Sequence, residues 1–387
     1  MVTKTIEGSR ACAEAVRNCE PDVVACYPIT PSTHVAEQLA KYYADGELKN
    51  YVTPEAEFSV MSTLVGASAT GARTFTTTSG QGLLYMHEVL FNASGMRLPI
   101  VALVANRAVS APLSIWNDQQ DTVSQRDTGW IQIYCESNQE AVDAIPQAYK
   151  VAEKTMLPAM VCIDGHYLTH AVEQLEIPAV EQIRKYLPKF SPSLRLDANN
   201  PLTFGAYANP GYYQEFREDL MKDMDAAKEE LAKAGREYGE MFGRGYGLTE
   251  AYQCADAQYV MVSMGSVVGN IKFVVDELRA SGVKAGCLKI RVYRPFPKAE
   301  VRAALAGKIV GVFEKDMSPG GPAPLYSDVL DAVHKASCTA SSFIGGLGGR
   351  DITRDDVRKM FEAIKAGEPV KQWVHRNEWK PVFGETK

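Results

Sequence analysis

Two acids near residue 57 are the first side chains in this 387-residue sequence whose setting suits chemistry. Glu55 and Glu57 stand just before residues 58–72, a run without charge whose side chains are small or apolar. The helix dipole favours an acid at the start of a helix, so a structural role is one interpretation. A carboxylate set against a tightly packed apolar helix is also typical of a catalytic acid. The residues alone leave both interpretations open for both acids.

Arg107 is the second candidate, because it closely follows a wholly apolar strand at residues 99–105. It could form an ion pair with an acid such as Asp118 or Asp121. Arginine also binds carboxylates through a bidentate fork, so an anionic substrate is the rival interpretation.

A glycine turn places these candidates in a supersecondary unit. Residues 73–78 are rich in Thr with one Phe, as in a buried strand, and they end at Ser79-Gly80-Gln81-Gly82. A predicted helix at 83–94 and the apolar strand at 99–105 complete a βαβ unit of a parallel sheet. Ligands of such sheets bind beyond the carboxyl ends of the strands. Gly80, Gln81, Gly82 and Arg107 fall at that edge, so we expect a small molecule there.

The rest of the first half predicts one doubly wound α/β domain. The remaining elements are expected as a helix at 7–18, a strand at 22–27, a helix at 34–45, strands at 49–52 and 130–135, a helix at 139–155 and a strand at 160–164. They give a sheet of about six mostly parallel strands. The strand at 22–27 runs into a loop stiffened by Pro28 and Pro31, whose hydroxyl neighbours can cap the next helix.

The second half predicts a connection and a second, smaller α/β domain. Prolines indicate an extended connection at 175–210, and a charged segment at 212–241 indicates one long bridging helix. The second α/β pattern is then expected as strands at 259–264, 283–291 and 308–313, helices at 271–281 and 324–335, a proline-stiffened turn at 292–297, and a tail at 352–387 that is helical and then irregular. We place the domains at 1–245 and 246–387.

Composition narrows the class of protein. The formal net charge of −6 and the lack of a basic cluster argue against nucleic-acid binding. No apolar run suits a signal peptide or a membrane span, so a cytoplasmic protein is expected. Eight cysteines are scattered without a CxxC, and we assign them neither disulfides, a metal nor an iron–sulfur cluster. His34 and His87 have no partner at ligand spacing and are interpreted as structural.

Four motifs in order resemble the α subunits of the pyruvate:ferredoxin oxidoreductase family. They are YPITPST at 27–33, the helix that starts at Glu57, TSGQGLLYM at 78–86 and NRAVSAPLSIWNDQQD at 106–121. The resemblance continues to RPFP at 294–297 and covers nearly the whole chain. It implies a pyrimidine-type thiamine diphosphate-binding domain followed by a transketolase C-terminal-like domain.

The resemblance also implies roles for individual residues, and its spacing selects Glu57 over Glu55. Glu57 would bind N1′ of the aminopyrimidine, where a carboxylate favours the imino tautomer. Arg107 and Thr30 would hold the carboxylate and keto oxygen of a 2-oxoacid. The residues expected to line the cofactor are Pro28, Ile29, Gly80, Gln81 and Gly82. The implied reaction is the reversible oxidative decarboxylation of pyruvate with CoA to acetyl-CoA and CO2, with reduction of ferredoxin.

Two features of that family are missing from this sequence. The diphosphate–Mg²⁺ motif GDG is absent, since Asp164-Gly165-His166 lacks the first glycine, and cluster-binding cysteine spacing is absent too. We therefore expect Mg²⁺, the diphosphate half of thiamine diphosphate and [4Fe-4S] clusters to reside in β-, γ- and δ-type partner subunits. The chain should be inactive by itself.

Substrate choice rests on the Thr30 loop, which carries no positive charge. An oxalate enzyme would need such charge for a second carboxylate, so pyruvate is preferred over oxalate, 2-oxoglutarate and branched-chain oxoacids. A non-catalytic subunit, in which Glu57 and Arg107 form structural ion pairs, is an alternative from another class. A dinucleotide-binding protein is a further one, but the first strand lacks the GxGxxG that it requires.

Overall fold

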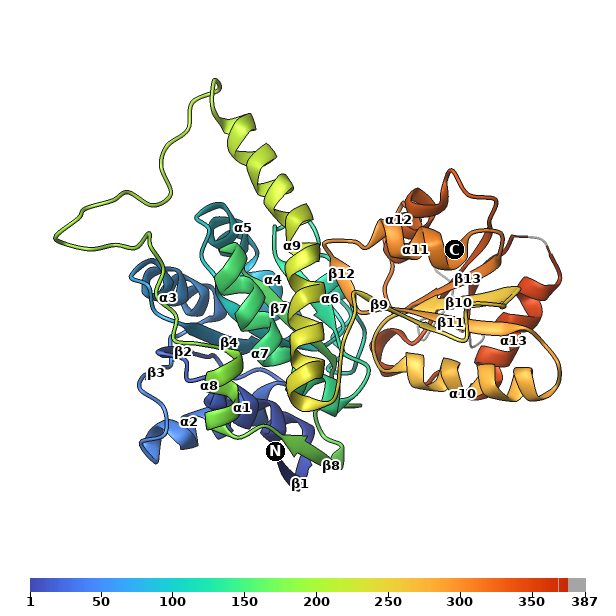
Figure 1. Ribbon diagram of the computed structural model, residues 1–387, viewed down its shortest axis with the longest axis horizontal. Helices are drawn as coiled ribbons and strands as arrows, with labels where there is room; N and C mark the ends of the chain where they lie inside the picture. The colour runs from blue at the N-terminus through green and yellow to red at the C-terminus, as the bar shows by residue number, and fades with distance from the viewer. Residues whose placement is uncertain (368, 375–387) are drawn as a thin grey trace, which may run out of the picture.

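The computed structural model describes residues 1–367 and 369–374, so the predicted tail from 375 onward lies outside the described residues. Two α/β units lie side by side, a larger one built mainly by the chain up to Phe242 and a smaller one built by most of the chain after it (Figure 1). The α/β class predicted from the sequence is confirmed.

The larger unit is built on a seven-stranded sheet with the order β12-β6-β7-β5-β4-β2-β3. Its strands are β2 (Val23–Ala25), β3 (Tyr51–Val52), β4 (Thr74–Thr78), β5 (Val101–Asn106), β6 (Ile131–Tyr134), β7 (Ala159–Asp164) and β12 (Val292–Arg294). All neighbours are parallel except β12, which runs antiparallel to β6. Successive residues of β5 feed different cores: Val101 and Leu103 pack on one face, Ala102 and Val104 on the other. Both faces therefore need helices.

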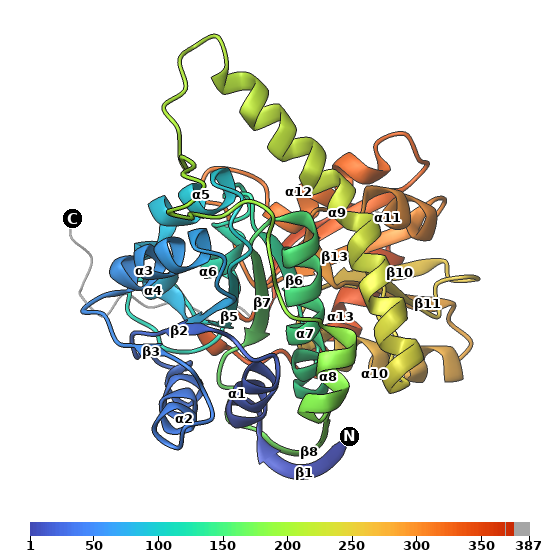
Figure 2. The same cartoon turned by 60° about the vertical axis from the view of Figure 1, so that its left-hand side comes forward.

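Helices cover both faces, as a doubly wound sheet requires (Figure 2). One face packs against α1 (Gly8–Asn18), α2 (Thr33–Ala44), α7 (Asn138–Thr155), α8 (Val180–Tyr186) and α9 (Tyr213–Phe242). The other packs against α3 (Glu57–Ala69), α4 (Gly80–Tyr85), α5 (His87–Gly95) and α6 (Gln120–Val123).

Two predictions for the larger unit are wrong. The expected helix at 83–94 is two helices, and α4 already begins at Gly80, so the glycine turn forms the first turn of a helix. The supposed extended connection at 175–210 contains the second half of β8 (Val172–Ile177) and all of α8. β8 pairs antiparallel with β1 (Val2–Glu7), a ribbon with many exposed side chains that no apolar run marks in the sequence.

The smaller unit has a six-stranded sheet with the order β15-β14-β13-β10-β11-β9. Its strands are β9 (Thr249–Tyr252), β10 (Tyr259–Ser263), β11 (Ala285–Ile290), β13 (Ile309–Glu314), β14 (Thr339–Ile344) and β15 (Lys371–Trp373). Its helices are α10 (Val267–Ala280), α11 (Lys298–Leu305), α12 (Pro324–Val333), the 3-10 turn η1 (Leu347–Gly349) and α13 (Arg354–Lys365). The sheet is parallel except at its edge strand β9.

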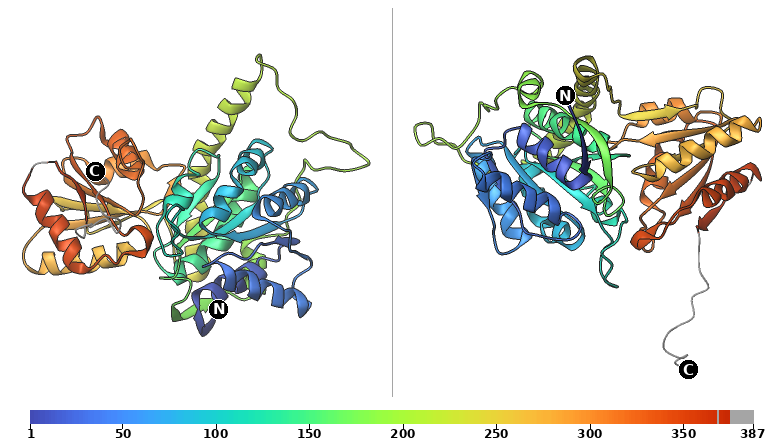
Figure 3. Two further views of the ribbon diagram at one scale, coloured as in Figure 1. Left: turned by 180° about the vertical axis from the view of Figure 1, so that it is seen from behind. Right: turned by 90° about the horizontal axis from the view of Figure 1, so that it is seen from below.

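The chain crosses between the units more than once. The expected turn at 292–297 is wrong, because its first residues form β12 and extend the larger sheet. The predicted long helix is confirmed as α9, whose buried residues begin at Leu220, so its first turns project from the body together with the segment before it (Figures 1 and 3). None of the helices in the described ranges combines the length and apolarity needed to cross a membrane.

Candidate functional site

Glu57 is a buried acid at the first position of α3, with only 7% of its surface exposed. In the described part of the chain its carboxylate has no hydrogen bond and no ion pair. Glu55 is exposed instead, and its Oε1 accepts a hydrogen bond of 2.5 Å from Ser59 Oγ. The fold therefore separates the two acids that the residues alone leave equivalent.

The first turn of α4 lies directly against Glu57. A Cβ placed on Gly82 would come within 2.6 Å of Glu57 Oε1, so a side chain there would displace the Glu57 carboxylate. Gly80 has a positive φ of 47° and faces the Arg107 side chain, whose Cδ is 3.2 Å from the place of a Cβ. Between them, both polar atoms of the Gln81 amide are buried, and neither has a partner among the described residues.

Arg107 reaches the same place from the end of β5. Its Nη1 donates to the Thr30 carbonyl (3.1 Å) and its Nε to the Ser114 carbonyl (3.2 Å). The ion pair with Asp118 or Asp121, one of the two interpretations left open by the sequence, does not form, since no carboxylate within the described ranges lies at salt-bridge distance from this guanidinium. Burial lowers the pKa of Arg107, but an arginine remains charged throughout the physiological range.

Asp121 links the glycine turn of α4 to the backbone at Arg107. Its fully buried carboxylate accepts hydrogen bonds from the backbone N–H groups of Gly80 (2.9 Å), Arg107 (2.9 Å) and Thr122 (2.8 Å), and from Asn106 Nδ2 (2.8 Å). Burial raises the pKa of Asp121 to about 7, although the hydrogen bonds oppose the rise. The sequence predicts Asp121 only as a possible partner of Arg107, because convergence of four donors appears only in the fold.

The loop after β2 brings Thr30 to the site. Ser32 fastens the loop by donating its N–H and Oγ–H to the Ile29 carbonyl (2.9 and 2.8 Å). The Thr30 carbonyl binds Arg107, and Pro31 packs against Gly165 at the end of β7. Pro28 is exposed and Ile29 is half-buried on the same loop, without a hydrogen bond to the other candidates. The structure thus brings Glu57, Gly80, Gln81, Gly82, Arg107 and Thr30 to one edge of the sheet.

The smaller unit supports the loop that follows Arg107. Asp164, which ends β7, accepts hydrogen bonds from Lys315 Nζ (2.9 Å) and Ser266 Oγ (2.5 Å). Lys315 also donates to Asn117 Oδ1 (3.0 Å), and Gly349 of η1 donates to the Asn117 carbonyl. Although burial acts to raise the pKa of Asp164, Lys315 and its other donors hold it below its usual value. The Asp164 carboxylate therefore joins the two units.

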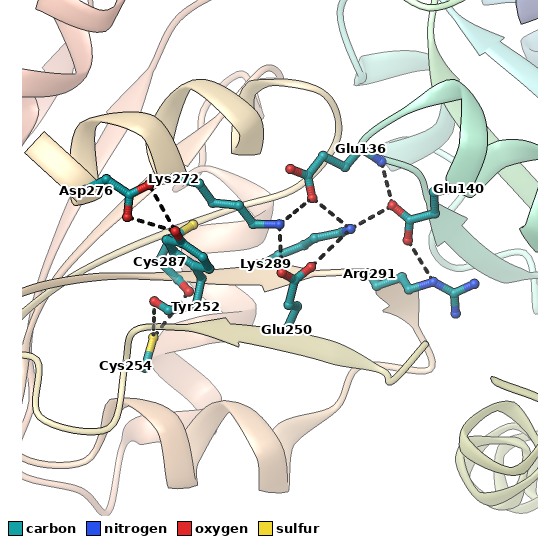
Figure 4. Close-up of polar contacts among 10 residues, drawn as sticks. All are labelled: Glu136, Glu140, Glu250, Tyr252, Cys254, Lys272, Asp276, Cys287, Lys289 and Arg291. Carbon is teal, nitrogen blue, oxygen red and sulfur yellow. Dashed lines mark hydrogen bonds and ion pairs between the residues drawn. The ribbon is translucent and has the colours of Figure 1, made fainter. Parts of the chain in front are cut away.

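A second set of contacts between the two units is a largely buried network of charged side chains (Figure 4). Lys289 Nζ of β11 lies 2.7 Å from Glu140 and 3.0 Å from Glu136, while Arg291 Nε lies 2.9 Å from Glu140. Burial acts to raise the pKa of Glu140, but Lys289 and Arg291 outweigh it and lower the pKa. Lys272 of α10 completes the cluster at 2.8 Å from Glu136. None of these partners is predictable from sequence spacing.

Both histidines interpreted as structural lie outside this site. His87 Nδ1 lies 2.5 Å from Gln125 Oε1, and His34 Nδ1 lies 2.6 Å from Glu7 Oε1. All eight cysteines are free thiols, and all but Cys338 are buried.

Solved structures with the same fold support the two-unit architecture. A 2-oxoglutarate:ferredoxin oxidoreductase from Magnetococcus marinus matches 94% of this chain with a TM-score of 0.68 and 20% identity. The present chain spans 65% of the length of that protein's chain. A split-gene transketolase in an inactive β4 tetramer matches 94% of this chain and 98% of its own, with a TM-score of 0.53 and 11% identity. At these identities the likeness concerns the fold alone.

Relatives in sequence are far more similar. Pyruvate synthase subunit PorA from Methanothermobacter thermautotrophicus is 46% identical over 379 residues, which cover 97% of this chain and 98% of that one. Ketoisovalerate oxidoreductase subunit VorA from Pyrococcus horikoshii is 42% identical over 370 residues, 94% of each chain.

Two sequence families match consecutive parts of the chain. Residues 14–236 match the family described as pyruvate flavodoxin/ferredoxin oxidoreductase, thiamine diphosphate-binding. Residues 257–357 match the family described as pyruvate:ferredoxin oxidoreductase core domain II. The chain therefore belongs to the pyruvate:ferredoxin oxidoreductase family, and its first unit is a thiamine diphosphate-binding domain.

Proposed function

We propose that this chain is the α-type subunit of a pyruvate:ferredoxin oxidoreductase (pyruvate synthase, EC 1.2.7.1). The complex would convert pyruvate and CoA reversibly to acetyl-CoA and CO2 while reducing ferredoxin. The observation that carries the proposal is Glu57, a buried carboxylate without a partner among the described residues, set against the glycine turn of α4. The name of the relative that is 46% identical supports the same assignment.

The residues present fit the aminopyrimidine half of thiamine diphosphate. Burying a carboxylate costs free energy unless a partner binds it. The Gln81 amide is also buried without a partner among the described residues, so it too calls for a bound group. Gly80 and Gly82 carry no side chain, so Arg107 and Glu57 lie directly against the backbone of α4 here. When bound, thiamine diphosphate supplies the nucleophilic carbon and the electron sink for decarboxylation. Glu57 would hold the proton shared with N1′, and Pro28 and Ile29 would line the cofactor from the loop after β2.

Arg107 and Thr30 suit the substrate. The Arg107 guanidinium is charged and largely buried, and within the described residues it is bonded only to two carbonyls, so a substrate carboxylate would be its first anionic partner there. Thr30 lies beside it and would orient the keto oxygen. The rival hypothesis of a non-catalytic subunit requires ion pairs of Glu57 and Arg107, and neither exists within the described residues.

The remaining parts of the enzyme are proposed to lie in partner subunits. Asp164 stands where a GDG motif would have its aspartate, but its carboxylate is occupied by Lys315 and Ser266. The diphosphate, Mg²⁺ and [4Fe-4S] clusters would therefore be held by β-, γ- and δ-type subunits. Eight free thiols favour a reducing compartment, so the cytoplasm is the proposed location.

Pyruvate is the proposed substrate, with 2-oxoisovalerate as the second candidate. The VorA relative favours the second candidate, since its identity of 42% is close to the 46% of PorA. The uncharged Thr30 loop offers nothing to a second carboxylate, which disfavours oxalate and 2-oxoglutarate. A comparison of kcat/KM for the four oxoacids decides between them.

The test uses the complex purified through this chain, with viologen reduction dependent on pyruvate and CoA as the assay. Glu57→Gln should lower kcat by about 100-fold or more, because a group that moves a proton contributes about that much. Arg107→Ala should mainly raise the pyruvate KM, by roughly 10- to 100-fold, since it removes a charge-assisted contact worth about 1.5–3 kcal/mol.

Glu55→Gln is the matched control, because it makes the same change two residues away on an exposed acid. It should leave the rate unchanged. If Glu57→Gln and Glu55→Gln have equal rates in complexes of unchanged composition, the proposed role of Glu57 is wrong.

A further inference from the structure

Glu7, His34 and His170 form a cluster of possible metal ligands on the face of the first unit that carries β1. Glu7 ends β1, His34 lies in the first turn of α2, and His170 lies in the loop after β7. One possible ligand atom from each side chain lies within 4.8 Å of the other two. We propose that this cluster binds a divalent transition-metal ion of the zinc type.

The chemistry of the three ligands selects the kind of ion. Two imidazoles and one carboxylate are a common ligand set for zinc and related ions, whereas Mg²⁺ and Ca²⁺ prefer oxygen. Bonds of about 2.1 Å in a tetrahedral site would place the ligand atoms about 3.4 Å apart. Side-chain rotations can shorten the ligand distances that exceed this value. They can also move His34 Nδ1 away from Glu7 Oε1, from which it now lies 2.6 Å. His170 is exposed, so water can take the fourth position.

The backbone beneath the cluster is already fixed. Ser9 donates its N–H and its Oγ–H to the Thr169 carbonyl (3.0 and 2.9 Å), and Gly8 donates to the Ala171 carbonyl (3.0 Å). A Cβ on Gly8 would lie 2.2 Å from the Leu168 carbonyl oxygen, so this contact requires glycine. The end of β1 and the His170 loop are thus held together before any ion binds.

Polar contacts with neighbouring groups also assign the ligand atoms. Thr169 Oγ1 lies 2.7 Å from His170 Nδ1, which leaves Nε2 of that ring for an ion. Arg10 Nε lies 3.4 Å from Glu7 Oε2, which leaves Oε1 facing His34. Fixing the second nitrogen of a histidine ligand in this way is usual in metal sites.

A row of rings links this cluster to the loop that follows Arg107. The ring centroids are 5.1 Å apart for His34 and His170, 4.8 Å for His170 and His166, and 4.4 Å for His166 and Trp116. His34 also lies four residues after Thr30. An ion here would therefore hold β1, α2 and the His170 loop together beside the candidate active site, without taking part in its chemistry.

The test is zinc binding by the full chain after treatment with EDTA and desalting. Isothermal titration with Zn²⁺ should give one ion per chain, and added Zn²⁺ should raise the melting temperature. Co²⁺ should give visible absorption bands of a site with nitrogen ligands. His170→Ala and Glu7→Gln should each weaken Zn²⁺ binding by at least about 100-fold, since even loss of an outer-shell partner costs about 10- to 100-fold.

His334→Ala is the matched control, because it removes an exposed histidine at the end of α12. It should leave affinity and stoichiometry unchanged. Glu7→Gln keeps a hydrogen-bond acceptor for His34, so it separates loss of a ligand from loss of the fold, which circular dichroism checks. Absence of zinc binding by the wild-type chain, or an equal loss in His334→Ala and His170→Ala, would overturn the proposal.

Discussion

Glu57 Oε1 lies 2.6 Å from the point that a Cβ on Gly82 would occupy. Thr78 Oγ1 lies equally close to the same point, so the first turn of α4 is enclosed by the end of β4 and the start of α3. The lack of a side chain at residue 82 is therefore what allows a buried carboxylate from one helix to reach the backbone of another. This contact couples the acid to the glycine turn more directly than their spacing in sequence implies.

Gly82→Ala should abolish thiamine diphosphate binding and turnover while the complex still assembles. The added methyl group must displace the Glu57 carboxylate or α4 itself, because contacts below 3.0 Å are not tolerated. Cofactor content per complex and viologen reduction measure the effect. Gly66→Ala, at an exposed position of α3 with open space around its Cβ, should keep activity and add up to about 1 kcal/mol of stability. Equal activity of the two variants would contradict this account.

The site edge was predictable because its elements carry strong local patterns. The apolar run at 99–105, the Thr-rich run at 73–78 and the glycine turn between them identify the βαβ unit without knowledge of distant residues. Gly80, Gln81, Gly82 and Arg107 follow from that unit, since the carboxyl ends of parallel strands share one edge.

What was missed depends on contacts between distant residues. β1 and β8 form a largely exposed ribbon, so neither carries an apolar run, and β12 precedes a proline that favours the interpretation as a turn. Glu7, His34 and His170 are separated by 27 and 136 residues, a spacing that no metal motif has. The donors to Asp121 are mostly backbone N–H groups, which leave no trace in residue type.

Asp121→Asn should lower both stability and activity. An amide in place of the carboxylate offers one acceptor oxygen where two now receive four donors, so at least one buried N–H loses its partner, at about 1–3 kcal/mol. Because Gly80 and Arg107 are both fixed by this carboxylate, the pyruvate KM should rise as well. Urea unfolding and steady-state kinetics measure the two effects. Asp127→Asn, on a nearby exposed acid, is the control, and identical behaviour of both variants would refute the positioning role.

Glu140→Gln should weaken the junction between the two units. The substitution leaves Arg291 buried without a carboxylate partner among the described residues and removes one of the partners of Lys289 (Figure 4). Breaking a buried ion pair on one side costs about 3–5 kcal/mol. Hydrogen exchange at β6 and β12 and urea unfolding should both report the loss. Glu362→Gln alters an exposed acid of α13 and should behave as wild type; a shared midpoint for the two variants would show that the network adds no stability.

Asp316→Asn should make stability less dependent on pH. Both carboxylate oxygens of Asp316 are buried, no N–H or O–H group among the described residues donates to them, and Glu314 interacts with this carboxylate. Burial raises the pKa of Asp316 to about 7, and burial together with the Asp316 charge raises that of Glu314 to about 10. An acid whose pKa is higher in the folded state contributes stability that is complete below about pH 4 and is lost as the pH rises through its folded pKa.

The wild-type free energy of unfolding should therefore fall by about 1 kcal/mol more than that of Asp316→Asn between about pH 6 and pH 8. Urea unfolding at the two pH values measures the difference. Asp225→Asn, on a side chain that is 72% exposed, should retain the wild-type slope. If Asp316→Asn is instead destabilised equally at both pH values, the aspartate is ionised throughout, because a cation such as Arg126 compensates its charge in the folded state.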